Sequence, residues 1–112
     1  MIDDYRFGEI TIAGKTYRTD VIVYPDHIDA HWWREQGHNL AINDIKNVID
    51  AKPDVVVIGT GELGLMQVEK ETVDHLKKLG IKIIVLPTKK AYIEFNRLVT
   101  TQKVVACLHL TC

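Results

Sequence analysis

Three stretches of the chain carry apolar patterns that predict strands of a central sheet. Residues 55–58 read Val-Val-Val-Ile without a break, and an unbroken β-branched run is typical of a parallel strand buried on both faces. Residues 81–86 form a second apolar run, which Pro87 ends. Residues 103–110 alternate, with one face formed by Val104, Ala106, Leu108 and Leu110. We therefore predict two buried strands and a third strand near the carboxyl end.

The amino-terminal part of the chain shows strand-like alternation on a smaller scale. Residues 7–12 and 16–24 are extended stretches joined by the turn Ala13-Gly14-Lys15, so we predict an antiparallel hairpin. Residues 28–34 predict a further short strand, in which the adjacent Trp32 and Trp33 point to opposite faces. One tryptophan is then expected in the core, and the other faces a second layer or the surface.

Three helices are predicted between the strands. Asn43 can cap the first helix, which Pro53 ends, and the second runs from about residue 69 to residue 79 with Gly80 at its C′ position. Thr88 can cap the third. Their apolar stripes are formed by Ile45, Val48 and Ile49, by Val73, Leu76 and Leu79, and by Ala91, Phe95, Leu98 and Val99.

This alternation of helices and strands, joined by short loops, predicts α/β layers with right-handed crossovers and the antiparallel hairpin beside the sheet. The chain has 112 residues, which suits a single domain with one core over residues 1–112. We find no repeat, low-complexity tract or linker in it.

Composition excludes some classes of function. The net charge is −1 and the charged fraction is 26%, so the chain lacks the basic field typical of nucleic-acid binding. Its apolar runs are far shorter than the roughly 20 residues of a membrane span, and its first residues lack the basic and apolar parts of a signal peptide. We therefore expect a cytoplasmic protein, with Cys107 and Cys112 as free thiols.

Several motifs together resemble one small domain family. They are Gly59-Thr60-Gly61 after the β-branched strand, Gly80-Ile81, Thr88, Ala91, Phe95-Asn96 and Leu98 in the third helix, and the ending Val104-Val105-Ala106 with Leu108-His109. The family is uncharacterised and named after a methanogen protein, and it includes an adipogenesis-associated vertebrate protein and a mitochondrial complex I assembly factor. The resemblance covers essentially the whole chain, most clearly residues 54–112, and the similarity to the methanogen member looks close.

The resemblance implies a three-layer α/β fold around a mixed, largely parallel sheet with an additional β layer. It brings no catalytic residues to this chain, because no activity or catalytic set is established for the family. The complex I role belongs to a mitochondrial branch, and no motif of this chain indicates it.

Residues 59–64 formally match the dinucleotide-binding pattern G-x-G-x-x-G. In that fold the third glycine opens a helix whose amino end holds the pyrophosphate. Here residues 65–68 separate the loop from the helix, Glu62 would repel a pyrophosphate, and no acidic residue ends the next strand. The chain is also too short for both halves of that fold, so we expect no dinucleotide cofactor.

A different site is expected if the two buried strands are parallel neighbours. The 59–61 loop and Thr88 would then both emerge at the carboxyl ends of the strands, where ligand crevices of α/β sheets lie. Free amides of the third helix, with Lys89 and Lys90 in its first turn, could bind a small anion. The alternative is that the glycines serve a tight turn and the lysines are simply solvated.

Two further groups of residues have a functional and a structural interpretation. Cys107 and His109 share one strand face, but two ligands do not complete a zinc site, and a Cys–His nucleophile needs an orienting third group. A buried thiol beside a hydrogen-bonded histidine is the simpler interpretation, so we expect no metal. Trp32-Trp33-Arg34 has the composition of a protein-binding hot spot, or else of core packing with a solvated arginine.

Two hypotheses about function follow. The first is a non-catalytic binding or assembly module that acts through protein contacts and a small anionic ligand, without a cofactor. The second is an enzyme or cofactor-binding protein with a site at the strand ends, formed by Gly59, Thr60, Gly61, Thr88, Lys89 and Arg34. An electropositive pocket at the strand ends favours the second hypothesis, and a filled surface there favours the first.

Overall fold

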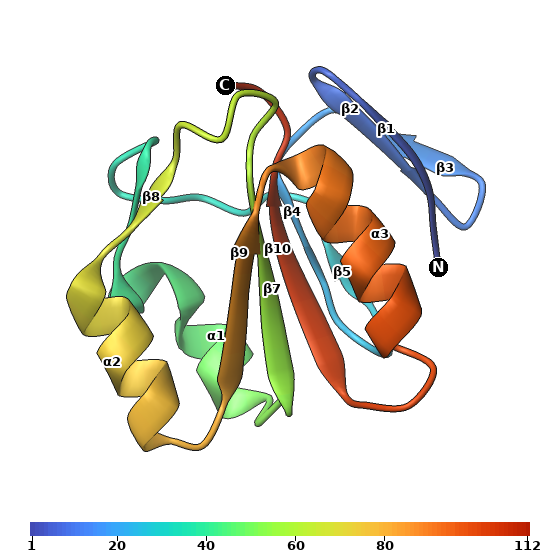
Figure 1. Cartoon of the computed structure of the whole chain (residues 1–112). Coiled ribbons are helices and arrows are strands. Elements are labelled where there is room, and N and C mark those ends of the chain that lie inside the picture. The colour runs from blue at the N-terminus through green and yellow to red at the C-terminus, as the bar shows by residue number, and fades with distance from the viewer.

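The computed structural model describes residues 1–112 and has a five-stranded mixed sheet at its centre (Figure 1). Its strand order is β5-β4-β10-β7-β9, with β4 at Val21–Val23, β5 at Ile28–Asp29, β7 at Val55–Thr60, β9 at Lys82–Leu86 and β10 at Val104–His109. Strands β10, β7 and β9 run parallel, whereas β4 pairs antiparallel with β10 and β5 with β4. The predicted mixed, largely parallel sheet is therefore confirmed.

Strands β7 and β10 are buried along their whole length because both faces of the sheet are covered. On one face, Val55 and Val57 pack in a core with α3 (Thr88–Leu98). On the other face, Val56 and Ile58 pack in a second core with α1 (Lys46–Asp50) and α2 (Lys70–Lys78). The unbroken β-branched run thus serves two cores at once.

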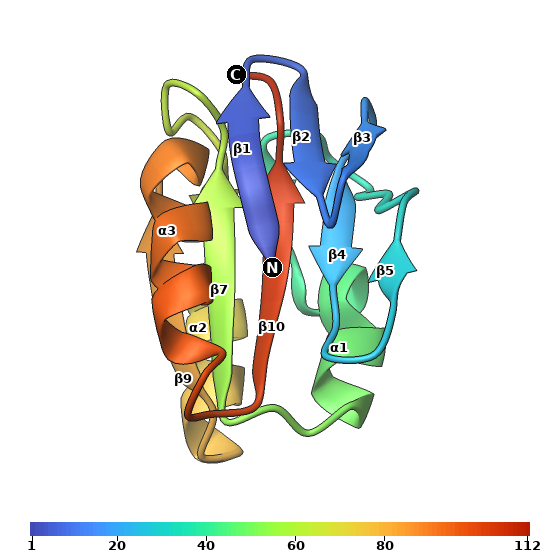
Figure 2. The same cartoon turned by 90° about the vertical axis from the view of Figure 1, so that its right-hand side faces the viewer.

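A separate antiparallel sheet shares the outer layer with α3. It consists of β1 (Ile2–Arg6), β2 (Glu9–Ile12) and β3 (Lys15–Tyr17), and Figure 2 shows it in front of the central sheet and beside α3. The predicted hairpin is confirmed for β2 and β3. Strand β1 was not predicted, and Asn96 of α3 fixes it by hydrogen bonds with both the amide and the carbonyl of Ile2.

Two predicted strands differ from the structure. The extended stretch 16–24 divides between two sheets, because Val21–Val23 is buried on both faces beside β10. In the stretch 28–34, only Ile28–Asp29 forms a strand. The tryptophans nevertheless point apart, since Trp32 is buried with its indole N–H donating to the carbonyl of Asp44, whereas Trp33 is 76% exposed.

The first residues of two helices also differ from the prediction. Ile42–Ile45 forms a 3-10 helix (η1) before α1, with Ala41 rather than Asn43 at its N-cap; the Asp44 side chain accepts from the Ala41 amide at 2.9 Å. Helix α2 follows the prediction, and Gly80 after it has a φ of +75°, which favours glycine. Pro87, not Thr88, is the N-cap of α3.

The strand β9 is an edge strand rather than a fully buried one. It pairs only with β7, and Val85 is 44% exposed. A small parallel pair, β6 (Asn39–Leu40) and β8 (Gln67–Val68), completes the fold outside the central sheet. None of the helices has the length and apolar character needed to cross a membrane.

Candidate functional site

The predicted loop and Thr88 meet at the carboxyl ends of the parallel strands. The Gly61 amide donates to Thr88 Oγ1 at 2.9 Å, and the Thr88 amide donates back to the Gly61 carbonyl at 3.1 Å. Thr60 is buried, and its hydroxyl donates to the Leu86 carbonyl at 3.1 Å. The loop is thus joined directly to the end of β9 and the start of α3.

Both glycines of this loop permit close approach of other parts of the same chain. A Cβ at Gly59 would lie 2.8 Å from Thr88 Oγ1 and 2.8 Å from a Leu108 methyl. Gly61 has a φ of +101°, and a Cβ there would lie 2.5 Å from the Thr111 carbonyl oxygen. The backbone that comes close to Gly59-Thr60-Gly61 therefore belongs to α3 and the carboxyl-terminal residues.

Thr88 is a buried connection between three strand ends rather than a helix cap. Its hydroxyl donates to the His109 carbonyl at 2.6 Å while accepting from Gly61. Lys89 follows it as an exposed residue in the first turn of α3. Because Thr88, Lys90 and Ala91 donate their amides to the Gly61 and Pro87 carbonyls, Lys89 supplies the one free amide among the first four of this helix.

Arg34 lies in a buried ionic network beside these residues. Its Nη2 donates to Asp20 Oδ2 at 2.8 Å and to the Gly37 carbonyl at 3.0 Å, and its guanidinium stacks over Trp32 at 4.5 Å. His109 Nδ1 lies 2.8 Å from the same Asp20 oxygen. We place the His109 proton on Nδ1, because the Asp20 carboxylate can only accept. Arg34 Nη2, which lies 3.0 Å from Nδ1, then donates to Asp20 and Gly37 rather than to His109.

The network holds Asp20 in its charged form. Burial opposes ionisation of Asp20, but hydrogen bonds from His109, the Leu110 amide and Arg34 outweigh it and lower the pKa of Asp20. Two buried nitrogens of the network, Arg34 Nη1 and His109 Nε2, have no hydrogen-bond partner. The ring of His38 meets that of His109 edge-on at 5.7 Å.

In this network His109 could act as a general base and Asp20 orients it, as in a nucleophilic site. The network contains no activated nucleophile. Cys107 is fully buried, and burial raises the pKa of its thiol well above the ordinary value; a thiolate is needed for attack. Both cysteines are free, as expected. No three His, Cys, Asp or Glu side chains come close enough together to hold a metal ion.

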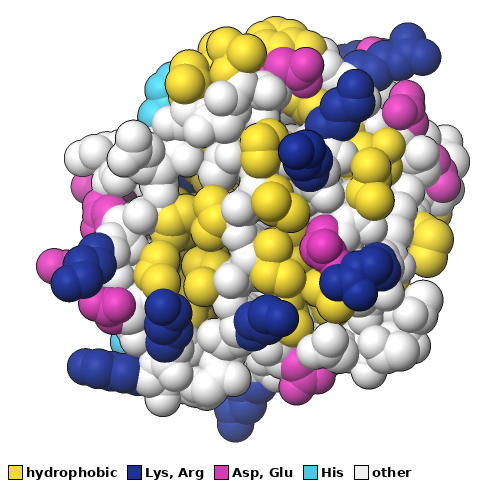
Figure 3. Space-filling view, viewed as in Figure 1, with side chains coloured by type: hydrophobic (Ala, Val, Ile, Leu, Met, Phe, Trp, Pro, Cys, Tyr) yellow, Lys and Arg dark blue, Asp and Glu magenta, His cyan; other side chains and the backbone are white.

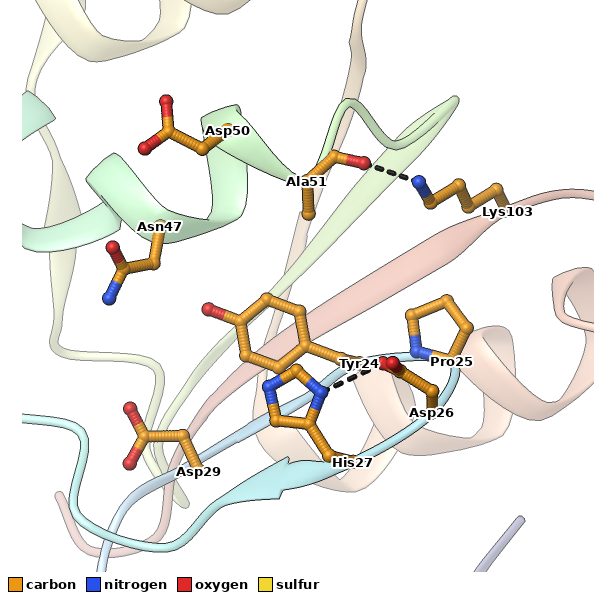
Figure 4. Close-up of a pocket in the computed structure, with 9 residues that line it drawn as sticks. All are labelled: Tyr24, Pro25, Asp26, His27, Asp29, Asn47, Asp50, Ala51 and Lys103. Carbon is orange, nitrogen blue, oxygen red and sulfur yellow. Dashed lines mark hydrogen bonds and ion pairs between the residues drawn. The ribbon is translucent and has the colours of Figure 1, made fainter.

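No cavity opens at the strand ends. None of the five cavities in the structure is lined by any of the six predicted site residues. The largest, of about 680 Å³, lies instead between the β4–β5 turn and α1 (Figure 4). The sequence did not indicate this cavity, because its walls come from residues 24–29, 47–51 and 103, which carry no motif.

The fold and the strand-end network define a small α/β domain whose parallel strand ends are closed by its own chain. The chain belongs to the family described as protein of unknown function (DUF498/DUF598), which matches residues 2–109. This match confirms the resemblance at the level of the family.

Three solved structures with the same fold share about a quarter of their residues with this chain. A conserved hypothetical protein from Pyrococcus horikoshii, PH1505, is 25% identical, with a TM-score of 0.86 over 100% of this chain and 99% of its own. A protein named MT938 is 27% identical, with a TM-score of 0.84 over 100% and 98%. A Bartonella henselae protein described as an outer membrane protein is 26% identical, with a TM-score of 0.83 over 99% and 94%. These identities support the expected closeness to the methanogen member only weakly.

Proposed function

We propose that this chain is a non-catalytic cytoplasmic binding or assembly module that acts through protein contacts. The observation that carries the proposal is the unpaired outer edge of β9. An edge strand presents unpaired N–H and C=O groups, which pair readily with an extended segment of another chain.

Exposed apolar side chains surround this edge and support its use as a contact surface. We call Leu63, Leu65, Leu79 and Val85, which are 71, 51, 50 and 44% exposed, the β9 surface. Gly64 lies against Pro87 at the end of β9, which brings the loop carrying Leu63 and Leu65 to the strand. Figure 3 shows hydrophobic side chains gathered over the middle of this face, with lysines and arginines around them.

The closed strand ends favour this proposal over an enzyme or cofactor-binding protein. Gly59, Thr60, Gly61 and Thr88 bind one another and neighbouring strands, and Arg34 has internal partners. A small anion would have to bind through the exposed Lys89 and its one free amide. A buried ligand site would instead need a concave pocket with convergent polar groups.

The test is affinity capture from cells that express the chain, with a variant of the β9 surface and a matched control. Val85→Lys places a charge at the edge, whereas Ile93→Lys places the same charge on α3 at a residue that is 57% exposed. We expect wild type and Ile93→Lys to retain the same partner and Val85→Lys to lose it. Absence of a reproducible partner, or equal retention by all three, would refute the proposal; light scattering identifies a second copy of the chain as the partner.

A further inference from the structure

The largest cavity has an aromatic floor that the proposed function does not use. Tyr24, at the end of β4, and His27, before β5, stack with ring centroids 4.3 Å apart and planes 10° apart. The turn between them forms one wall and α1 forms the other (Figure 4). At about 680 Å³, the cavity is in the range of small-molecule sites.

The hydroxyl of Tyr24 is an unused polar group at this floor. Tyr24 is only 7% exposed, yet its hydroxyl makes no hydrogen bond within the chain, and Figure 4 shows it pointing into the cavity on the side of Asn47 and Asp29. Burial, with smaller contributions from the neighbouring Cys107 and Asp29, raises the pKa of Tyr24 to about 12. The hydroxyl is not one of the two buried unpartnered atoms of the chain, so it is accessible from the cavity and open to a ligand.

The charges of the cavity are divided between its two ends. Asp26 is paired with His27 at 2.7 Å, and the Lys103 ammonium donates to the Ala51 carbonyl, on the opposite side from the Tyr24 hydroxyl (Figure 4). Asp29 and Asp50 also line the cavity, whose one lysine is Lys103. An anionic ligand is disfavoured there, because two carboxylates would repel it.

A second hollow extends the carboxylate end toward the exposed Trp33. It shares Asp29 and Asn47 with the first cavity and adds Asp44, with Lys46 as its one cation. Indole and phenol rings beside carboxylates are the composition that binds organic cations. A bare metal ion fits less well, because no three ligating side chains converge.

We propose that the cavity between the β4–β5 turn and α1 binds an alkylammonium or guanidinium group. The cation lies over the Tyr24–His27 floor, and its three or more N–H groups donate to Asp29, the Asn47 side-chain oxygen and the Tyr24 hydroxyl oxygen. The Asp50 carboxylate adds negative charge to the same cavity. A free polyamine and a lysine or arginine side chain of a peptide present this same chemistry. The proposal is independent of the β9 surface, so each can fail without the other.

The experiment is an NMR titration of the whole chain with spermidine and with Nα-acetyl-lysine amide. Nα,Nε-diacetyl-lysine amide, which lacks the charge, is the control ligand. The variants are Asp29→Asn, Asp50→Asn and Tyr24→Phe, with Asp74→Asn on α2 as the matched control, since it removes the same charge outside the cavity. Asparagine at position 29 keeps an oxygen to accept from the His31 amide, the native partner of Asp29, so the turn is preserved.

We expect saturable shifts of the cavity residues with one or both charged probes and none with the diacetylated probe. Each carboxylate substitution should weaken binding about two- to fivefold, the range of an exposed ion pair, while Asp74→Asn should leave it unchanged. The tighter of the two charged probes identifies the source of the cation. Absence of saturable shifts, equal shifts with the uncharged probe, or unchanged affinity in Asp50→Asn and Tyr24→Phe would overturn the proposal.

Discussion

Replacing Asp20 by asparagine tests the buried ionic network directly. The carboxylate accepts three hydrogen bonds of 2.8 Å, from Arg34 Nη2, His109 Nδ1 and the Leu110 amide. Asparagine retains one oxygen, which can still accept from Leu110. Its amide nitrogen is a donor and would face Arg34, which offers only donors.

The magnitude follows from the burial of the pair. The Arg34 side chain is 5% exposed and that of Asp20 is 18% exposed, so Asp20→Asn leaves a buried guanidinium without a counterion. Removing one partner of a buried pair costs about 3–5 kcal/mol. Two hydrogen bonds from Arg34 to the Gly37 carbonyl remain, which places the expected loss at about 3 kcal/mol.

Urea unfolding at pH 7, followed by circular dichroism, measures this loss. The matched control is Asp4→Asn, because Asp4 forms an exposed pair with Arg6 at 3.4 Å; its effect should stay within about 0.5 kcal/mol. The double variant Asp20→Asn/Arg34→Met leaves no unpaired charge, so it should be more stable than the sum of its single changes predicts. A loss below about 1 kcal/mol for Asp20→Asn would refute the network as a stabilising element.

The same network predicts how stability depends on pH. Despite the opposing effect of burial, the hydrogen bonds lower the pKa of Asp20 in the folded state below its ordinary value of 3.8, so the unfolded chain binds this proton first as pH falls. The stability contributed by Asp20 is therefore complete well above 3.8 and is lost as pH falls through the folded value. Urea midpoints measured between pH 5 and pH 2 should decline less steeply in Asp20→Asn than in wild type, and parallel declines would contradict the assignment.

Three further substitutions or reactions test the closed strand ends and the core. Gly61→Ala should lower the melting temperature more than Gly80→Ala, because both have positive φ but only Gly61 meets backbone atoms within 3 Å. Thr88→Val should cost about 1–3 kcal/mol in urea unfolding by leaving two buried backbone groups unpaired, whereas Thr88→Ser keeps the hydroxyl; equal losses would count against this role. A thiol reagent should modify one cysteine, Cys112, in the folded protein and Cys107 only on unfolding, since Cys107 is buried; rapid reaction of both would show that the core opens.

Individual strands and helices could be predicted from sequence, whereas the pairing of strands with one another could not. The run Val55–Ile58 indicated a central strand because its β-branched residues fill both cores. The similar run at residues 81–86 indicated the same, yet β9 lies at the edge. An apolar run indicates that a strand is covered by other elements, but the position of that strand in the sheet depends on pairing with distant residues. Strand β1 was missed for the same reason, since Asn96 fixes it across 94 residues of sequence.

At the candidate site too, contacts between residues far apart in the chain could not be predicted from sequence. The sequence correctly indicated that Gly59-Thr60-Gly61 and Thr88 would adjoin, because carboxyl ends of parallel strands share one edge. It could not indicate that Asp20, 89 residues away from His109, would complete a buried network there. Glycine is required wherever backbones approach closely, whether the neighbour is a phosphate or the same chain. Here the neighbours are Thr88 and Thr111, so a glycine pattern typical of ligand loops serves to close the sheet, and ligand binding is more reasonably sought on the exposed β9 edge and in the acidic cavity beside α1.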